Sequence, residues 1–187
     1  VRADALRQTG QADLAESAYK RLLTTPQESA GYRGLGLLAG ARGNYSEAAQ
    51  LLRQAQRKTP TDALLLSDLG YASLRAGQFE EARLPLMQAL QLQPDSKQAQ
   101  ANAALYFEVT NQQEQATTLM DANRMPESTR AAVRETASRM RTAGDSIPPM
   151  PPASASAGSA RSVELENSEP LPLALKPSRW AGMGGVR

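Results

Sequence analysis

The chain has 187 residues, a formal net charge of +2 and an aromatic content of only 4%. Its basic and acidic residues are interspersed without a long basic run, so we expect no nucleic-acid partner. Cysteine and histidine are absent, which removes thiol nucleophiles, the usual zinc sites and the commonest general base. No apolar run approaches the roughly 20 residues of a membrane-spanning helix. We therefore predict a protein that is not an enzyme and that uses no metal and no cofactor.

Residues 1–28 have the pattern of a partial helical repeat. The second half of this segment carries small and apolar residues at helical spacing and ends at a proline, and part of another helix precedes it. The residues are Gly10, Ala15, Ala18, Leu22 and Pro26. Because the chain starts inside a helical pattern, we expect the natural N-terminus to lie upstream of Val1.

The next two segments, residues 29–62 and 63–96, repeat each other with a period of 34 residues. Ten positions carry identical or similar residues at this spacing: Tyr32/Leu66, Leu35/Leu69, Gly36/Gly70, Ala39/Ser73, Gly43/Gly77, Tyr45/Phe79, Ala48/Ala82, Leu52/Leu86, Ala55/Ala89 and Pro60/Pro94. The period and the positions of Gly, Ala and Pro resemble the tetratricopeptide repeat (TPR). This resemblance implies an all-α solenoid of helical hairpins that winds into a right-handed superhelix.

The glycines of the repeat have two expected roles. Gly36 and Gly70 fall in the middle of a helix, where glycine costs about 1 kcal/mol relative to alanine, so we expect a second helix to approach closely there. Ala82 is the expected neighbour of Gly70. Gly43 and Gly77 are expected to end the first helix of each hairpin in the left-handed conformation.

Residues 97–126 read as a degenerate third repeat. Asn111 replaces the turn glycine, and asparagine is the best substitute because it tolerates a positive φ. Pro126 arrives early and opens a last helix, residues 127–142, with Val133 and Ala137 on its apolar face. We interpret it as a capping helix that completes a TPR domain over residues 1–144.

Residues 145–187 form a tail rich in Pro, Ser and Ala, which we expect to be disordered because it has too little apolar surface to bury. Within it, residues 171–180 carry Leu171, Leu173, Leu175 and Trp180, which are apolar enough to act as a docking segment. A tail without any docking function remains the simpler alternative.

The TPR resemblance also implies a partner-binding groove lined by the first helix of each hairpin. The residues expected there are Arg33, Leu37, Leu64, Asp68, Tyr71, Leu74, Arg75, Asn102 and Leu105. Some TPR domains clamp a terminal carboxylate with basic and polar residues, and Leu37, Asp68 and Gln98 depart from that pattern. We therefore expect an apolar strip that suits an amphipathic helix or an extended apolar segment. The alternative for about half of these residues is packing between repeats.

Three arginines of the last helix, Arg130, Arg134 and Arg141, share one face. A solvated face is the default interpretation, and contact with an acidic partner is the alternative.

The chain further resembles the TadD-type proteins of tight-adherence (Flp) pilus systems, which are related to PilF-type pilotins. The similarity rests on three segments, 69–72 (LGYA), 77–86 (GQFEEARLPL) and 102–106 (NAALY). It implies a lipoprotein that faces the periplasm at the outer membrane and binds a secretin or another pilus assembly component. Its membrane contact would depend on a lipid anchor that this chain does not contain. A cytoplasmic TPR co-chaperone or scaffold of another system is the alternative.

Overall fold

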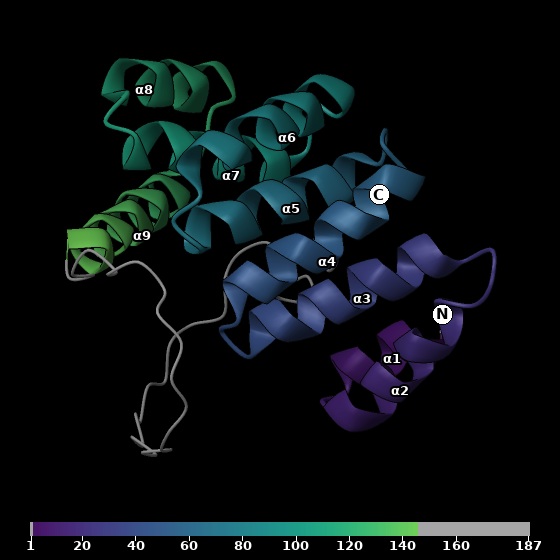
Figure 1. Cartoon of the computed structure of the whole chain (residues 1–187). Coiled ribbons are helices and arrows are strands. Elements are labelled where there is room, and N and C mark those ends of the chain that lie inside the picture. The colour runs from purple at the N-terminus through teal and green to yellow at the C-terminus, as the bar shows by residue number, and fades with distance from the viewer. Residues whose placement is uncertain (1, 146–187) are drawn as a thin grey trace, which may run out of the picture.

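The computed structural model describes residues 2–145, and within this range every element of regular secondary structure is a helix (Figure 1). The helices are α1 (Arg2–Gln8), α2 (Ala12–Leu22), α3 (Glu28–Ala41), α4 (Tyr45–Lys58), α5 (Ala63–Arg75), α6 (Phe79–Leu92), α7 (Lys97–Val109), α8 (Gln113–Ala122) and α9 (Glu127–Asp145). The predicted all-α class is confirmed for this part of the chain. The predicted tail, with its docking segment 171–180, lies outside the described residues.

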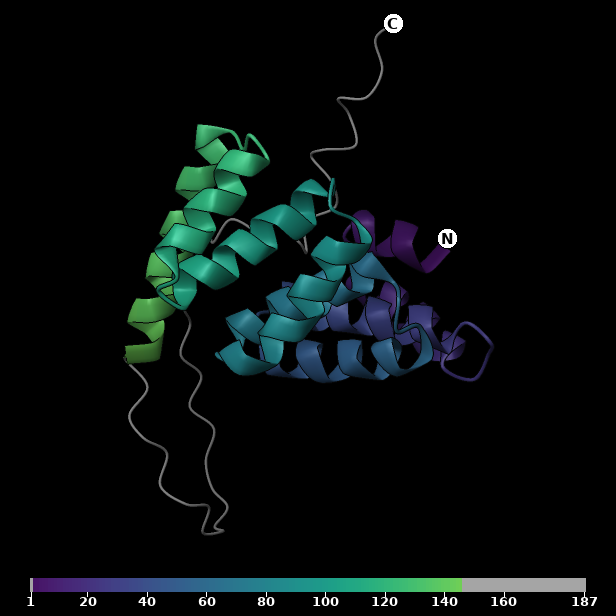
Figure 2. The same ribbon diagram turned by 90° about the horizontal axis from the view of Figure 1, so that it is seen from above.

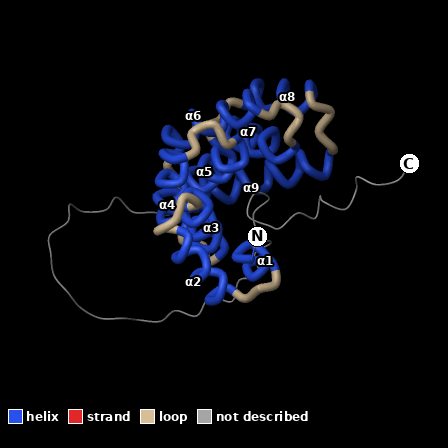
Figure 3. The backbone as a smooth tube through the Cα atoms, turned by 90° about the vertical axis from the view of Figure 1, so that its right-hand side faces the viewer, coloured by secondary structure: helices blue, strands red, loops and turns tan. Residues whose placement is uncertain are grey.

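Successive helices stack as antiparallel hairpins, and each hairpin packs on the next (Figures 1 and 3). The pairs α1–α2, α3–α4, α5–α6 and α7–α8 form the hairpins, and α2–α3, α4–α5 and α6–α7 join them. The first helices α5 and α7 also touch each other. The array ends with α9, which lies against α7 (Figure 2).

The turns between the helices of a hairpin use a left-handed residue. Gly43 and Gly77 have φ angles of 82° and 75°, and Asn111 takes the same place in the α7–α8 hairpin with φ 59°. There the N–H of Gln112 donates to the carbonyl of Phe107 at 2.7 Å, which satisfies a carbonyl at the end of α7. The predicted role of Asn111 as a substitute for glycine is therefore confirmed.

Close helix contacts at Gly36 and Gly70 agree with the prediction for these positions. A Cβ added at Gly70 would lie 2.3 Å from Cγ of Leu86, and one at Gly36 would lie 2.8 Å from Cγ of Leu52. The neighbour of Gly70 is therefore Leu86, one turn beyond the expected Ala82. The reason is that a leucine side chain reaches across to the glycine, whereas Ala82 only has to stay small for the helices to approach.

Candidate partner-binding face

The residues expected to line the groove all lie on the first helices of three successive hairpins, and we call them together the first-helix face. Helix α3 carries Arg33 and Leu37, and α7 carries Asn102 and Leu105. Between them, α5 carries the other five, Leu64, Asp68, Tyr71, Leu74 and Arg75.

A charged network connects α3, α5 and α7, the first helices of three successive hairpins. Nε and Nη2 of Arg33 in α3 donate to Oδ2 of Asp68 in α5 at 3.0 and 2.8 Å. Nε2 of Gln98 in α7 donates to the other oxygen, Oδ1, at 3.0 Å. Asp68 is 1% exposed, and both of its oxygens have donors. Its carboxylate therefore joins the hairpins to one another and is not open to a ligand.

An equivalent polar contact lies one hairpin further along the array. Nδ2 of Asn102 donates to Oγ of Ser67 at 3.0 Å. Both Arg33–Asp68 and Ser67–Asn102 join residues that are 35 positions apart, one more than the repeat period. Repeat position 5 of one hairpin therefore bonds to position 6 of the next.

Burial raises the pKa of Asp68 to about 6, because the charged carboxylate loses its hydration inside the array. The charge of Arg33 and the hydrogen bonds from Arg33 and Gln98 act in the opposite direction and limit the rise. For Arg33, burial is the largest single influence and acts to lower the pKa, but the charge of Asp68, its hydrogen bond and the charges of Asp62 and Asp4 together raise it. Asp68 therefore titrates within reach of neutral pH.

The apolar residues of the first-helix face form one continuous cluster. Leu37, Tyr71, Leu74 and Leu105 all belong to the same group of packed side chains, which spans three hairpins. They are also buried, and Tyr71 is only 2% exposed. Their side chains therefore pack between the repeats and contribute to the stability of the array, which is the alternative that the sequence left open; their part in a partner-binding strip stays a prediction.

Arg75 lies beside two tyrosines at the end of α5. Its guanidinium is 4.3 Å from the ring centroid of Tyr45 and 5.9 Å from that of Tyr71. Its Nη1 donates to the Tyr71 hydroxyl at 2.9 Å. These contacts fix the position of the positive charge, and cation–π interactions of this kind contribute about 0.5–1 kcal/mol each at partly exposed sites.

Besides Arg75, which is partly buried, Leu64 and Arg33 of the first-helix face keep substantial solvent exposure. Leu64, in the first turn of α5, is 41% exposed, and the side chain of Arg33 is 30% exposed. Asp68, which also accepts a hydrogen bond from Gln98, holds Arg33 in place, so that the arginine presents a charge of fixed orientation. A partner that contacts this face meets these two side chains first.

The geometry also bears on the predicted absence of a carboxylate clamp. A clamp needs several donors that point at one empty position, and here the position between Arg33 and Gln98 is filled by the carboxylate of Asp68. The N–H groups that could bind a terminal carboxylate here, those of Arg33 and Gln98, already donate to Asp68.

Arg130 and Arg141 of α9 differ from the default expectation of a solvated face, whereas the side chain of Arg134 is 48% exposed and agrees with it. Nε and Nη2 of Arg130 donate to the carbonyls of Met125 and Met120 at 2.8 and 3.0 Å; Met120 lies in the last turn of α8, and Met125 follows this helix. Nη1 of Arg141 donates to the carbonyl of Glu108 at 2.7 Å. These arginines hold α9 on the array, because a helix end leaves carbonyls without intrahelical donors.

The sequence analysis missed one packing site near the N-terminus. A Cβ at Gly34 would lie 2.1 Å from Cε1 of Tyr19, so that the ring occupies the space beside the glycine. The Tyr19 hydroxyl donates to Oδ1 of Asp4 at 2.7 Å. Burial and this hydrogen bond raise the pKa of Tyr19 to about 12. The signal that could have revealed the contact is Gly34, a glycine that is not part of the repeat pattern, together with Tyr19 in the preceding hairpin.

No group of three or more Asp and Glu side chains suited to a metal ion occurs among residues 2–145. None of the helices in that range has the length and apolar character needed to span a membrane.

Comparison with known proteins agrees with the architecture. The family model of the tetratricopeptide repeat matches residues 1–63 and, in a second overlapping match, residues 33–99. The chain is also similar to the TPR repeat-containing protein PA4299 of Pseudomonas aeruginosa, with 39% identity over 83 residues, which are 44% of this chain. It spans only 34% of the length of that relative. Since the family matches cover more than half of the 187 residues, the chain belongs to the tetratricopeptide repeat family.

Proposed function

We propose that this chain is a non-catalytic scaffold that binds a protein partner through the exposed edge of its first-helix face. TPR arrays generally serve as scaffolds for protein–protein interaction. The observation that carries the proposal is Leu64, an exposed leucine on the first-helix face, next to a charged network of fixed geometry. An exposed apolar side chain beside an oriented charge gives both contact area and direction to a bound segment.

For the partner itself, we propose a secretin or another assembly component of a tight-adherence pilus system. The support is the sequence similarity to TadD-type proteins, two of whose three segments, 69–72 and 102–106, include residues of the first-helix face. In this proposal the protein faces the periplasm at the outer membrane through a lipid anchor that lies outside these 187 residues. A palmitate-labelling experiment on the natural gene product tests the anchor.

Binding is tested with the purified secretin and pilus proteins encoded by the same genome. Leu64→Asp should weaken the binding of the cognate component at least tenfold, because it removes an apolar contact and adds a charge. Leu14→Asp is the matched control, since Leu14 is an exposed leucine on a second helix, α2, and should leave the affinity unchanged. Equal affinities for the parent and the Leu64→Asp variant would exclude this face. Binding to none of these components would contradict the pilus assignment.

A further inference from the structure

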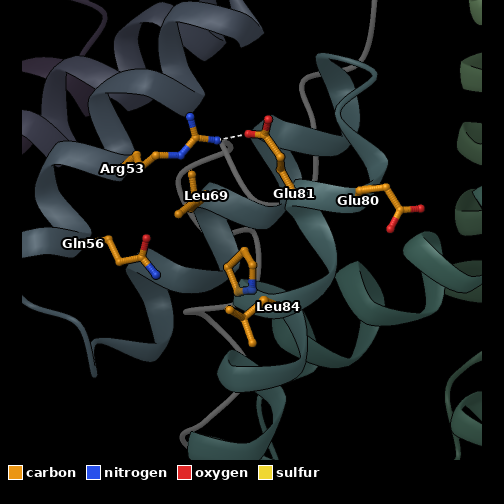
Figure 4. A pocket seen from close by; sticks show the side chains of 7 residues that line it. Arg53, Gln56, Leu69, Glu80, Glu81 and Leu84 are labelled. Atoms are coloured by element: carbon orange, nitrogen blue, oxygen red, sulfur yellow. Dashed lines mark hydrogen bonds and ion pairs between the residues drawn. The ribbon is translucent and has the colours of Figure 1, made fainter.

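A groove on the other side of the hairpins has a composition that neither the repeat pattern nor the first-helix face explains. It lies between the second helices α4 and α6, with Leu69 of α5 also lining it, and has a volume of about 480 Å³ (Figure 4). This volume is in the range of ligand-binding pockets, about 300–1,000 Å³. We call it the second-helix groove.

The groove exposes an apolar side chain at a position where the adjacent hairpins expose polar ones. Leu84 is 63% exposed, the largest exposure of any large apolar residue among the described side chains. The equivalent residues one repeat earlier and later, Gln50 and Thr118, are also exposed. The repeat therefore requires only that the residue at this position is exposed. Among the three hairpins compared, only α5–α6 has a leucine there.

The groove also carries acidic groups and a backbone acceptor. Glu81 forms an ion pair with Arg53 across the groove, as Figure 4 shows, and Glu80 beside it is exposed. Pro85 has no N–H, so that α6 supplies no i+4 donor to the carbonyl of Glu81. The groove thus combines the exposed Leu84, with the buried Leu69 and Pro85 beside it, with a carboxylate and a main-chain acceptor, a set that suits an extended apolar segment with a neighbouring basic residue.

The chain itself contains such a segment beyond the described residues. Leu171, Leu173 and Leu175 alternate in sequence, and Lys176 follows them. Alternate side chains of an extended segment face the same side, which matches a groove with one apolar wall. The connector of residues 146–170, fully extended, reaches about 80 Å, several times the roughly 15 Å radius of gyration of a folded unit of this size.

We propose that residues 171–180 bind in the second-helix groove of the same chain, with the leucines against Leu84 and with Lys176, which faces the opposite side of the extended segment, reaching outward to the exposed Glu80. Tethering raises the local concentration of the segment to as much as about 1 mM, so that a weak contact is enough to hold it. The contact uses a surface different from the first-helix face. An experiment that disproves this contact therefore does not disprove the function proposed above, and the reverse also holds.

Trp180, the only tryptophan of the chain, reports on this contact in the full-length protein. We expect the segment to shield Trp180 from acrylamide and Leu84→Gln to increase its quenching constant at least twofold. Gln is the residue that the preceding hairpin carries at this position, so the fold should be kept, which circular dichroism verifies. Leu64→Gln, on the first-helix face, is the matched control and should leave quenching unchanged.

A charge exchange tests the register of the segment. Glu80→Lys should also expose Trp180, and adding Lys176→Glu to that variant should restore the protection, because the pair is rebuilt with reversed signs. If Leu84→Gln and Glu80→Lys both leave quenching at the parent value, or if Leu64→Gln exposes Trp180 instead, the proposed contact is wrong.

Discussion

The central hairpins, α3–α4 and α5–α6, differ from the C-terminal region, α7–α9, in what brings their helices together. In each central hairpin a glycine of the first helix receives a leucine of the second, Leu52 at Gly36 and Leu86 at Gly70. In the α7–α8 hairpin Ala104 stands at the glycine position, and α8 is four residues shorter than α6. The chain then turns early, and α9 packs against α7.

This comparison shows that the array uses two kinds of joint. The central joints depend on missing side-chain volume, and the terminal joint combines the buried Val133 and Ala137 of α9 with added polar contacts, such as those of Arg130 with the carbonyls of Met120 and Met125. In a regular repeat, the next hairpin packs against the helix ends of the one before it. The last hairpin has no further hairpin to cover its helix ends. The terminal region therefore needs side chains that satisfy its own helix end.

The largest effect is expected at a central joint. Gly70→Leu should lower the free energy of unfolding by about 3 kcal/mol or more, because its Cβ alone would lie 2.3 Å from Cγ of Leu86. Urea denaturation measures the loss. Adding Leu86→Ala should recover part of it by making room. A single variant as stable as the parent would show that missing volume does not hold the central hairpins together.

The Arg33–Asp68–Gln98 network links the central hairpins to the terminal region, and it should give the protein a pH dependence. The pKa of Asp68 is about 6 in the folded protein and about 3.9 in an unfolded chain, so the folded state binds the proton more tightly. The contribution of Asp68 to stability is therefore fully present below about pH 4 and is lost as the pH rises through about 6. The loss is at most about 3 kcal/mol.

This dependence is checked by urea denaturation between pH 4 and pH 7. Asp68→Asn cannot titrate, so that its free energy of unfolding, relative to that of the parent, should increase over this range. Exposed Asp95 supplies the control, because Asp95→Asn should follow the parent at every pH. Parallel curves for the parent and Asp68→Asn would contradict a raised pKa.

At the terminal joint, Arg130→Ala should destabilise the protein by about 2 kcal/mol, since two helix-end carbonyls lose a charged donor. Hydrogen exchange in α9 should accelerate before exchange in α5 and α6. Arg139→Ala is the control, because Arg139 forms only an exposed pair with Glu135 and should cost less than about 0.5 kcal/mol. Equal effects of the two substitutions would remove the distinction between the joints.

The smallest effect concerns a difference between the two central hairpins. Ser73 occupies the position of Ala39, and its buried Oγ has no hydrogen-bond partner among the described residues. Ser73→Ala should therefore be neutral or raise the free energy of unfolding by up to about 1 kcal/mol. Thermal unfolding followed by circular dichroism measures it, and a lower melting temperature would indicate that the hydroxyl is hydrogen-bonded in solution.

The sequence alone determined the helical class, the hairpins and the chemistry of the turns. A period of 34 residues and the spacing of glycine and proline act through local geometry, so that Gly43, Gly77 and Asn111 could be assigned without any knowledge of contacts. The close approach at Gly36 and Gly70 also followed, because a mid-helix glycine requires a packing reason.

Only the tertiary structure decided which polar groups of the first helices meet. Asp68 could be placed on the first-helix face from the repeat, but its pairing with Arg33 and Gln98 depends on the offset between stacked hairpins, which the period does not contain. The same holds for Tyr19 beside Gly34 and for Arg130 at the end of α8. Local sequence fixes backbone conformation over a few residues, whereas these contacts depend on the rotation and translation of whole helices against one another.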